Sequence, residues 1–197
     1  MRTLFALLAL GSAFLFVQQT FGQDARIEEV GKSPVETKFA AGGRVHLDLC
    51  SSGVELVGRD DAMVRVSYHP ERENVKVRIQ VSGDRADIRL TGCPHNNFQA
   101  RIEIPKSSAL YVRMLAGQLD VREITGDKDV ELSFGQLNLD VGSADQYGRV
   151  EASVNSGQLE AAAFSVSKGG LFRSFSRNGS GKLRLHAHVG AGQLELR

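Results

Sequence analysis

Five histidines are the residues of this chain that could most readily bind a metal ion. His186 and His188 flank one alanine in the tripeptide HAH, so both imidazoles would lie on the same face of a β-strand. A zinc site needs three or four ligands, and no spacing in the sequence demands that the others complete the set. Those other histidines are His46, His69 and His95. We therefore predict that both HAH imidazoles face solvent and that the chain holds no metal and no cofactor.

Signatures of nucleophilic and phosphate chemistry are absent from the sequence. GSA at 142–144 lacks the GxSxG nucleophile elbow, and GSGK at 179–182 is not the GxxxxGK[ST] phosphate loop. Carboxylates are numerous, but a glycosidase needs two of them across a cleft at a set distance, which a sequence cannot establish. We predict no catalytic residues and no enzyme. The alternative is a carbohydrate-active enzyme built on a small β-helix.

Four glutamines recur in one triplet, GQL, within AGQLDV (116–121), FGQLNLD (134–140), SGQLEA (156–161) and AGQLEL (191–196). If these segments stack in register, the glutamines could form an amide ladder in which each side chain satisfies its neighbour. The alternative interpretation is a polar row that offers hydrogen bonds to a glycan. The candidate ligand-binding residues on that interpretation are Gln118, Gln136, Gln158 and Gln193.

Basic and aromatic residues also gather in KGGLFRSFSRNGSGK at 168–182, which interrupts the repeat. An extended loop with such side chains is a plausible contact surface for an acidic glycan or an envelope protein. The alternative is an ordinary strand pair in which Leu171, Phe172 or Phe175 is buried, because aromatic residues mostly fill cores. The candidate contact residues are Phe172, Arg173, Phe175 and Arg177.

The first residues of the chain predict export. Arg2 precedes an apolar run from Leu4 to Val17, and small and polar residues follow, as in a secretory signal peptide at 1–22. The run is shorter than the about 20 residues of a membrane span, so an N-terminal anchor is the less favoured alternative. No later stretch is long enough to cross a bilayer. We expect a periplasmic, cell-surface or secreted protein without a membrane span after cleavage.

Cysteine and charge usage agree with export. Cys50 and Cys93 both lie after the signal, where two thiols in an oxidising compartment most simply form one disulfide, and two buried free thiols are the alternative. The chain has 24 lysines and arginines, and removal of the signal peptide takes away one of them, Arg2. The remaining 23 basic residues equal the 23 acidic residues in number. A neutral chain gives no reason to expect a nucleic-acid partner. The oligomeric state cannot be read from these features.

Alternating apolar and polar residues dominate the chain from Arg44 onward. VHLDLC, MVRVSY, VKVRIQV, ADIRL, FQARIEIP and LYVRM each alternate over a few residues and are separated by Gly, Asp, Asn or Pro. This pattern is typical of half-buried β-strands. The sole helix candidate is a weak one at 161–166. The sequence therefore predicts an all-β protein.

The GQL triplets mark corners between strands. Val154 and Leu159 are five positions apart, so in one straight strand their side chains would point to opposite faces. Both can reach one core only if the backbone bends between them, and glycine adopts such bends without a Cβ clash. We expect the backbone to change direction at Gly117, Gly135, Gly157 and Gly192.

The repeat of strand, corner and strand favours a β-solenoid or β-roll, and a two-sheet β-sandwich is the alternative. SSGVELVG at 51–58 is a faint match to the repeat, shifted by one residue. We expect a signal peptide at 1–22, a lead-in at 23–42 that could be flexible, and a single domain at 43–197.

The segments RIEIPKSSALYVRMLAGQLDVREITGDKDVELSFGQLNLD and KLRLHAHVGAGQLEL resemble the "putative adhesin" family of bacterial envelope proteins. The likeness covers about residues 43–197. It implies an exported domain of glycine-led β repeats without catalytic residues, and the function of that domain is largely unassigned. We expect an adhesin-like binding or scaffold module whose partner is an envelope protein or a glycan.

Overall fold

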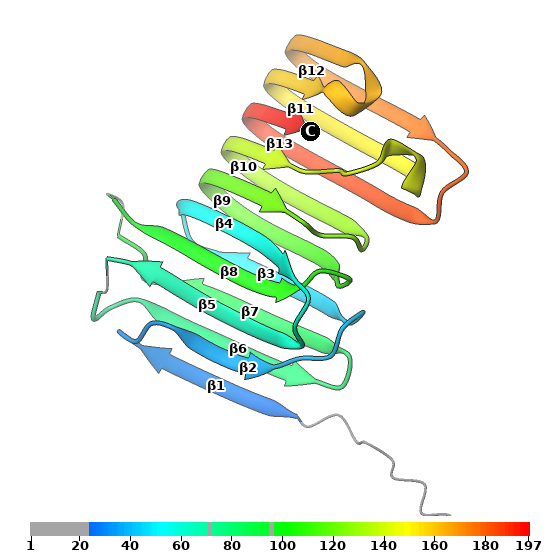
Figure 1. Cartoon of the computed structure of the whole chain (residues 1–197). Coiled ribbons are helices and arrows are strands. Elements are labelled where there is room, and N and C mark those ends of the chain that lie inside the picture. Colours follow the sequence, from blue (N-terminus) through cyan, green and yellow to red (C-terminus); the bar gives the residue numbers. More distant parts are fainter. Residues whose placement is uncertain (1–23, 71, 95–96) are drawn as a thin grey trace, which may run out of the picture.

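The computed structural model describes residues 24–70, 72–94 and 97–197, and the expected signal peptide at 1–22 lies outside them. The described chain is all-β, as predicted: its thirteen strands form one large mixed sheet that is not closed (Figure 1). Two 3-10 helices, η1 (Ala144–Gln146) and η2 (Ala162–Phe164), complete it. The strands are β1 (Ala25–Val30), β2 (Val35–Lys38), β3 (Arg44–Leu49), β4 (Ser52–Arg59), β5 (Met63–His69), β6 (Lys76–Ser82), β7 (Arg85–Thr91), β8 (Gln99–Pro105), β9 (Ala109–Arg122), β10 (Lys128–Leu139), β11 (Tyr147–Ala161), β12 (Val166–Asn178) and β13 (Leu183–Leu196).

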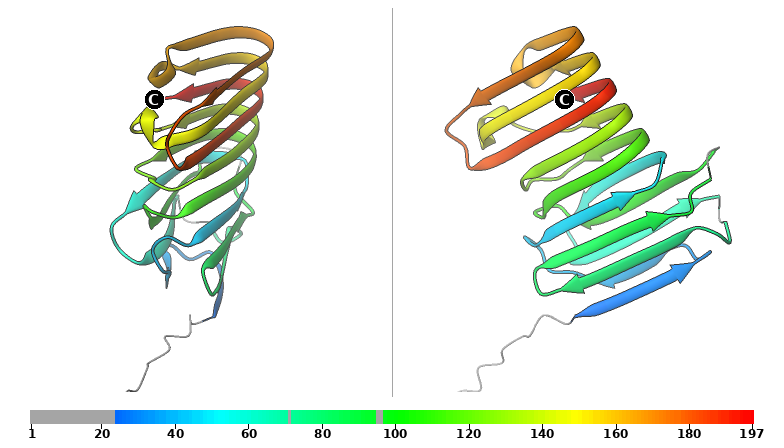
Figure 2. Two further views of the ribbon diagram at one scale, coloured as in Figure 1. Left: turned by 90° about the vertical axis from the view of Figure 1, so that its right-hand side faces the viewer. Right: turned by 180° about the vertical axis from the view of Figure 1, so that it is seen from behind.

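The sheet is folded so that two limbs face each other (Figure 2). The first limb runs β1-β6-β7-β3 and continues into the first halves of β9, β10, β13 and β11. The second limb runs β2-β5-β8-β4 and continues into the second halves of the same long strands. Because apolar side chains alternate along every strand, the inward faces bury one continuous core of Val, Leu and Ile between the limbs.

The GQL segments lie side by side in parallel strands. Gln136 of β10 pairs with Gln118 of β9 on one side and with Gln193 of β13 on the other, and Gln193 pairs with Gln158 of β11. The C-terminal strand β13 therefore lies between β10 and β11, and Figure 1 shows the C-terminus inside the stack. The spatial order of the repeats differs from their order in the sequence.

The glycines of these segments form a column where the strands pass from one limb to the other. Gly117, Gly135, Gly157 and Gly192 all have positive φ, between 124° and 142°. A Cβ at Gly135 would overlap the carbonyl oxygen of Gly117, and the other corner glycines of β11 and β13 are equally crowded by backbone. The leucines two positions later are fully buried: Leu119, Leu137, Leu159 and Leu194.

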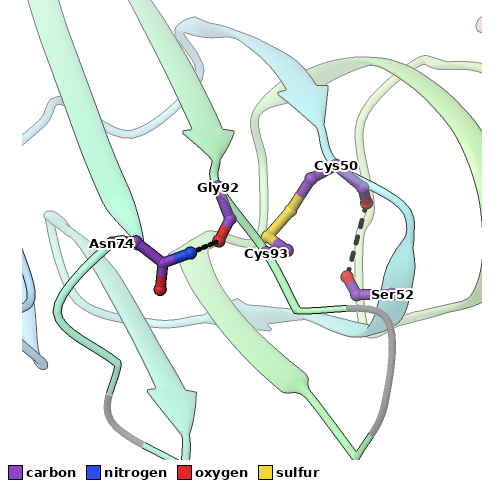
Figure 3. Close-up of a disulfide and its surroundings, with 5 residues drawn as sticks. All are labelled: Cys50, Ser52, Asn74, Gly92 and Cys93. Atoms are coloured by element: carbon purple, nitrogen blue, oxygen red, sulfur yellow. Dashed lines mark hydrogen bonds between the residues drawn. A yellow bond between two sulfur atoms is a disulfide. The ribbon is translucent and has the colours of Figure 1, made fainter.

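The earlier strands make the same passage through loops, and the predicted disulfide lies there. Cys50 links β3 of the first limb to β4 of the second, and Cys93 follows β7 on the way to β8. These two cysteines form the disulfide, with Cα atoms 6.0 Å apart (Figure 3). Ser52 donates to the carbonyl of Cys50, and Asn74 donates to that of Gly92. The bridge thus joins neighbouring passages between the limbs.

The first described residues form two strands of the sheet. Within the expected lead-in at 23–42, β1 pairs with β6 and β2 pairs with β5. Their alternating residues, including the buried Val35, extend the core beyond the expected boundary at residue 43. The helix candidate at 161–166 contains the single turn η2. Within the described residues, no helix has the length and apolar character needed to cross a bilayer.

Candidate functional site

A groove of about 740 Å³ lies on the outer face of the first limb. Four neighbouring strands, β6, β7, β3 and β9, supply its lining, because their solvent-facing positions carry long polar side chains between buried apolar ones. The pairing of these strands fixes which side chains are neighbours. The lining residues are His46, Leu47, Asp48, Arg78, Gln80, Arg85, Asp87, Ile88, Arg89, Tyr111 and Arg113.

Two aromatic rings stack within the groove. His46 of β3 pairs with Tyr111 of β9, and their ring centroids are 4.5 Å apart with an interplanar angle of 14°. Burial lowers the pKa of His46, and the nearby guanidinium of Arg85 lowers it further. The imidazole is therefore neutral at neutral pH, and the pair forms an uncharged aromatic wall.

Arginines surround this wall and are paired with carboxylates. Arg85 donates to Asp87 on its own strand at 2.6 to 3.0 Å, and Nε of Arg89 lies 2.9 Å from Asp48 across the β7–β3 pair. The other two guanidinium groups of the lining have carboxylate partners just outside it: Arg78 pairs with Glu28 of β1, and Arg113 pairs with Asp129 and Glu131 of β10. All four arginines of the groove are therefore held in ion pairs.

The sequence analysis predicted no catalytic residues, and the groove contains one pair of carboxylates that bears on this prediction. Asp48 and Asp87 both line it, and each is engaged by an arginine. Both carboxylates are thus already occupied by charged hydrogen-bond donors of the groove itself.

Three side chains beside the groove could hold a cation: Asp129 and Glu131 of β10 and His186 of β13 offer ligand atoms within 4.8 Å of one another. Burial would raise the pKa of Asp129, but hydrogen bonds from His186 (3.0 Å) and Arg113 (3.2 Å) outweigh it and the pKa is lowered. Arg113 also lies 3.1 Å from Glu131. This guanidinium already neutralises the two carboxylates, so the cluster is satisfied as an ion-pair network.

Both HAH imidazoles lie on the outer face of β13, between the buried Leu185, Ala187 and Val189. His186 contacts Asp129, and Nδ1 of His188 lies 2.8 Å from the hydroxyl of Ser153. Their neighbours come from β10 and β11, which the sequence does not place beside β13.

The four candidate glutamines stand in one row on the outer face of the second limb, and the side-chain hydrogen bonds of three of them run along the strands. Gln118 donates to Asp120 at 2.8 Å, Gln136 donates to Asn138 at 3.2 Å, and Gln158 donates to Glu160 at 2.5 Å. The expected amide ladder, in which each glutamine satisfies the next, is thus replaced by contacts with the polar residue two positions on. Asn138 carries the cross-strand bond instead, to Asp120 at 2.7 Å.

The basic and aromatic segment at 168–182 does not interrupt the stack. Most of it is the edge strand β12, which pairs antiparallel with β11 so that Gly170 lies opposite Gly157. Neither of the expected readings describes it fully: it is a strand, not a loop, yet Leu171 and Phe172 remain 63% and 81% exposed. Among the described strands, β12 is the last at this end of the sheet and β11 is its one neighbour.

The remaining candidate residues of β12 are held by local contacts. Nε of Arg173 donates to the carbonyl of Gly169 at 2.7 Å, which ties the two halves of the bent strand together. Phe175 packs against Phe164 of η2 with centroids 5.4 Å apart, and the guanidinium of Arg177 lies over the Phe164 ring. These residues cap the end of the core, and Phe172 alone of the four candidates projects freely.

Sequence reasoning missed the groove. The sequence analysis considered His46 only as a possible further ligand of a metal site at HAH. It did not consider Tyr111 as a site residue. The available signal was weak: both residues occupy polar positions of alternating segments, 65 positions apart. Only the pairing of β3 with β9 brings them together.

Comparison with known proteins supports the fold. A scan against models of known protein families finds no match, and a search of curated proteins finds none. Among solved structures, the chain is similar to "a putative cell adhesion protein from Clostridium sporogenes ATCC 15579". The TM-score is 0.51 at 12% sequence identity, and the match covers 89% of this chain and 100% of that chain. At this identity the likeness shows a shared fold alone.

Proposed function

We propose that the chain is an exported, non-enzymatic binding module of the bacterial envelope, with an adhesin-like role. The observation that carries this proposal is the groove on the outer face of the first limb, with its stacked His46 and Tyr111 among arginine–aspartate pairs. On this proposal the chain is a distant member of the adhesin-like family, and its glycine-led strands form a solenoid-like roll. The cell adhesion description of the similar structure is consistent with the role.

The construction of the face supports binding. The groove residues stand on paired strands, so their backbones are held by hydrogen bonds on both sides and little conformational entropy is lost when a ligand binds. The disulfide between Cys50 and Cys93 supports an extracytoplasmic location, because disulfides persist mainly in oxidising compartments.

The arrangement also favours a binder over the alternative, a carbohydrate-active enzyme. Hydrolysis of a glycosidic bond needs one protonated and one ionised carboxyl group beside the scissile bond. Asp48 and Asp87 are both paired with arginines, and the rest of the lining offers guanidinium, imidazole and phenol groups. Such a lining can hold a polar ligand without cleaving it.

The proposal is tested with the full exported chain immobilised on beads and exposed to a panel of purified bacterial envelope polysaccharides and intact cells. We expect retention of cells or polysaccharide by the native chain and loss of retention by Tyr111→Ala. Retained polysaccharide should keep its length after prolonged incubation; shortened chains would favour the enzyme.

A matched variant examines the glutamine row. Gln136→Ala with Gln158→Ala removes polar side chains from the second limb and leaves the groove intact. We expect this variant to retain its ligand. Loss of retention here, with Tyr111→Ala unaffected, would transfer the binding surface to the second limb and contradict the groove assignment.

A further inference from the structure

We propose that the outer side of the strand bends is a docking surface for a phospholipid bilayer with anionic headgroups. This surface is separate from the groove of the first limb and goes beyond the binding role proposed above. Three features support it: the place where exposed apolar side chains gather, the narrow convex shape of the bends, and a group of cations at one end of them.

The bends of β9, β10, β13, β11 and β12 stack along one edge of the molecule (Figure 1). At each bend, one residue next to the corner glycine is in register with its counterparts on the neighbouring strands. This row consists of Ala116, Phe134, Ala191, Ser156 and Leu171. Together with their chain neighbours Leu115 and Phe172, these residues form a continuous strip that we call the apolar ridge.

The apolar ridge holds four of the five exposed large apolar side chains of the described residues. The four are between 57% and 81% exposed: Leu115, Phe134, Leu171 and Phe172. The fifth, Val30, ends β1 at the other end of the sheet. Single exposed apolar residues are ordinary on a protein surface, whereas a contiguous group of them marks a contact site.

Phe172 is held in a conformation that its own surroundings do not stabilise. Its φ is 53°, in the left-handed region where a bulky side chain is strained. Because its ring is the most exposed of the four, packing within this chain offsets little of that strain. Strained residues cluster where proteins contact their ligands. We therefore expect Phe172 to find its contacts outside the chain.

The shape of the apolar ridge favours a lipid surface over a second protein. Four intervals of about 4.8 Å between its strands give a length of about 19 Å, and two residues along a strand give a width of about 7 Å. A stable protein interface buries about 800 Å² on each partner, which is far more than this strip offers. A fluid bilayer surface accommodates a narrow convex strip without a complementary shape of its own.

Cations without carboxylate partners lie at the β12 end of the apolar ridge. The segment 161–182 contains no acidic residue. Lys168 and Arg173 donate to backbone carbonyls, and Arg177 lies over the Phe164 ring. Within the described residues, none of these three cations forms an ion pair, in contrast to the arginines of the groove. Each cation near an anionic membrane surface adds to the affinity for it.

The carboxylates nearest to the apolar ridge lie behind it. Each stands three residues from a corner glycine or from Phe134, which is about 10 Å along a strand. They are Asp120, Glu160, Glu195 and Glu131. Apolar groups at a membrane surface enter it by about 5–10 Å, so these carboxylates remain on the water side. The uncharged glutamine row, next to the corner glycines, then lies at the level of the headgroups.

Sedimentation of the full exported chain with vesicles tests the proposal, using mixed phosphatidylglycerol and phosphatidylcholine, and pure phosphatidylcholine as the uncharged probe. We expect binding to the mixed vesicles that weakens as salt is raised, and binding to the uncharged vesicles that is at least about fivefold weaker. Phe134→Gln and Phe172→Asn should each weaken binding to the mixed vesicles by about tenfold, because each removes an aromatic ring from the lipid.

A charge variant and a matched control complete the experiment. Lys168→Gln should weaken binding to the mixed vesicles by about fivefold and leave binding to the uncharged vesicles unchanged. Tyr111→Ala removes an aromatic ring from the groove and leaves the apolar ridge intact, so it should bind the mixed vesicles as the native chain does. Circular dichroism should show all four variants folded, since Phe134 and Phe172 are exposed.

Three results would overturn the proposal. The first is failure of the native chain to bind the mixed vesicles, or equal binding by the native chain, Phe134→Gln and Phe172→Asn. The second is a dimer in sedimentation equilibrium without vesicles that dissociates in Phe134→Gln, because the apolar ridge would then be an interface between copies. The third is loss of vesicle binding in Tyr111→Ala, which would place the lipid contact at the groove. Retention of envelope ligands on beads by Tyr111→Ala would instead reject the proposed function and leave the apolar ridge untouched.

Discussion

Lys128 is a charged residue in an apolar row. Its partners in register, Leu110 of β9 and Leu185 of β13, are buried, and Lys128 itself is 2% exposed. Its Nζ donates to the hydroxyl of Tyr147 at 2.7 Å, and that hydroxyl donates to the carbonyl of Val141 at 3.1 Å. Burial lowers the pKa of Lys128 to about 8, even though Asp140 and Asp127 favour its charged form.

This residue predicts a pH dependence of stability. The ordinary pKa of 10.5 applies in the unfolded chain, so between pH 8 and about 10 the unfolded state binds more protons than the folded state. The free energy of unfolding should therefore rise with pH in that window, on the order of 1–2 kcal/mol. Lys128→Met should remove the rise and leave Tyr147 bonded to Val141. Urea unfolding at a series of pH values measures both effects.

The pH window is bounded by Tyr147. Burial raises the pKa of its phenol, so the folded state holds this proton longer than the unfolded state and stability falls above about pH 10. Measurements below that value isolate the lysine. An equal slope in Lys128→Met and the native chain would show that Lys128 is not its source.

At the scale of the element, the glycine column decides whether the long strands can bend and stack. Gly135 has φ of 127° and lies between the backbones of β9 and β13, so an added Cβ meets both conformational strain and the carbonyl oxygen of Gly117. We expect Gly135→Ala to destabilise the protein by more than about 3 kcal/mol or to prevent folding, because backbone cannot yield as a side chain can.

Gly142 separates the two causes. It also has positive φ, 63°, but a Cβ there meets nothing within 4 Å. Gly142→Ala should cost only the strain of the left-handed conformation, about 1–2 kcal/mol. Thermal unfolding followed by circular dichroism compares the variants. Similar losses at both positions would mean that close stacking of the corners contributes little.

Sequence predicts the strands well because alternation is a local property. Val45, Leu47 and Leu49, for example, are all buried as their alternation indicates. The sequence does not identify β12 as part of the repeat. This strand runs antiparallel to β11, so its corner glycine, Gly170, lies opposite Gly157 without being part of a GQL triplet. It also leaves the candidate site undefined, since His46 and Tyr111 meet only through the order in which strands pair.

At the scale of the molecule, the last strand, β13, sets the order in which the long strands pair. β10 and β11 are consecutive in the sequence but do not pair; β13 lies between them and pairs in parallel with both. The near identity of the GQL segments hides this arrangement, because any of them could pair in register with any other. Among the described strands, β11 and β12 therefore pair with the rest of the sheet only through β13.

This order predicts that the two ends of the chain differ in importance. Deletion of residues 183–197 removes β13 from the centre, leaves the facing edges of β10 and β11 unpaired, and separates the β11–β12 pair from the rest of the sheet. We expect this chain to lose cooperative unfolding in urea and to be cleaved rapidly by protease.

Deletion of 24–38 is the matched control, because it removes only the terminal strands β1 and β2, each of which pairs with one partner. That chain should unfold cooperatively at a lower urea midpoint, because its loss is confined to the edge of the core. If the chain without β13 unfolded as cooperatively as the chain without β1 and β2, the last strand would not hold the two parts together.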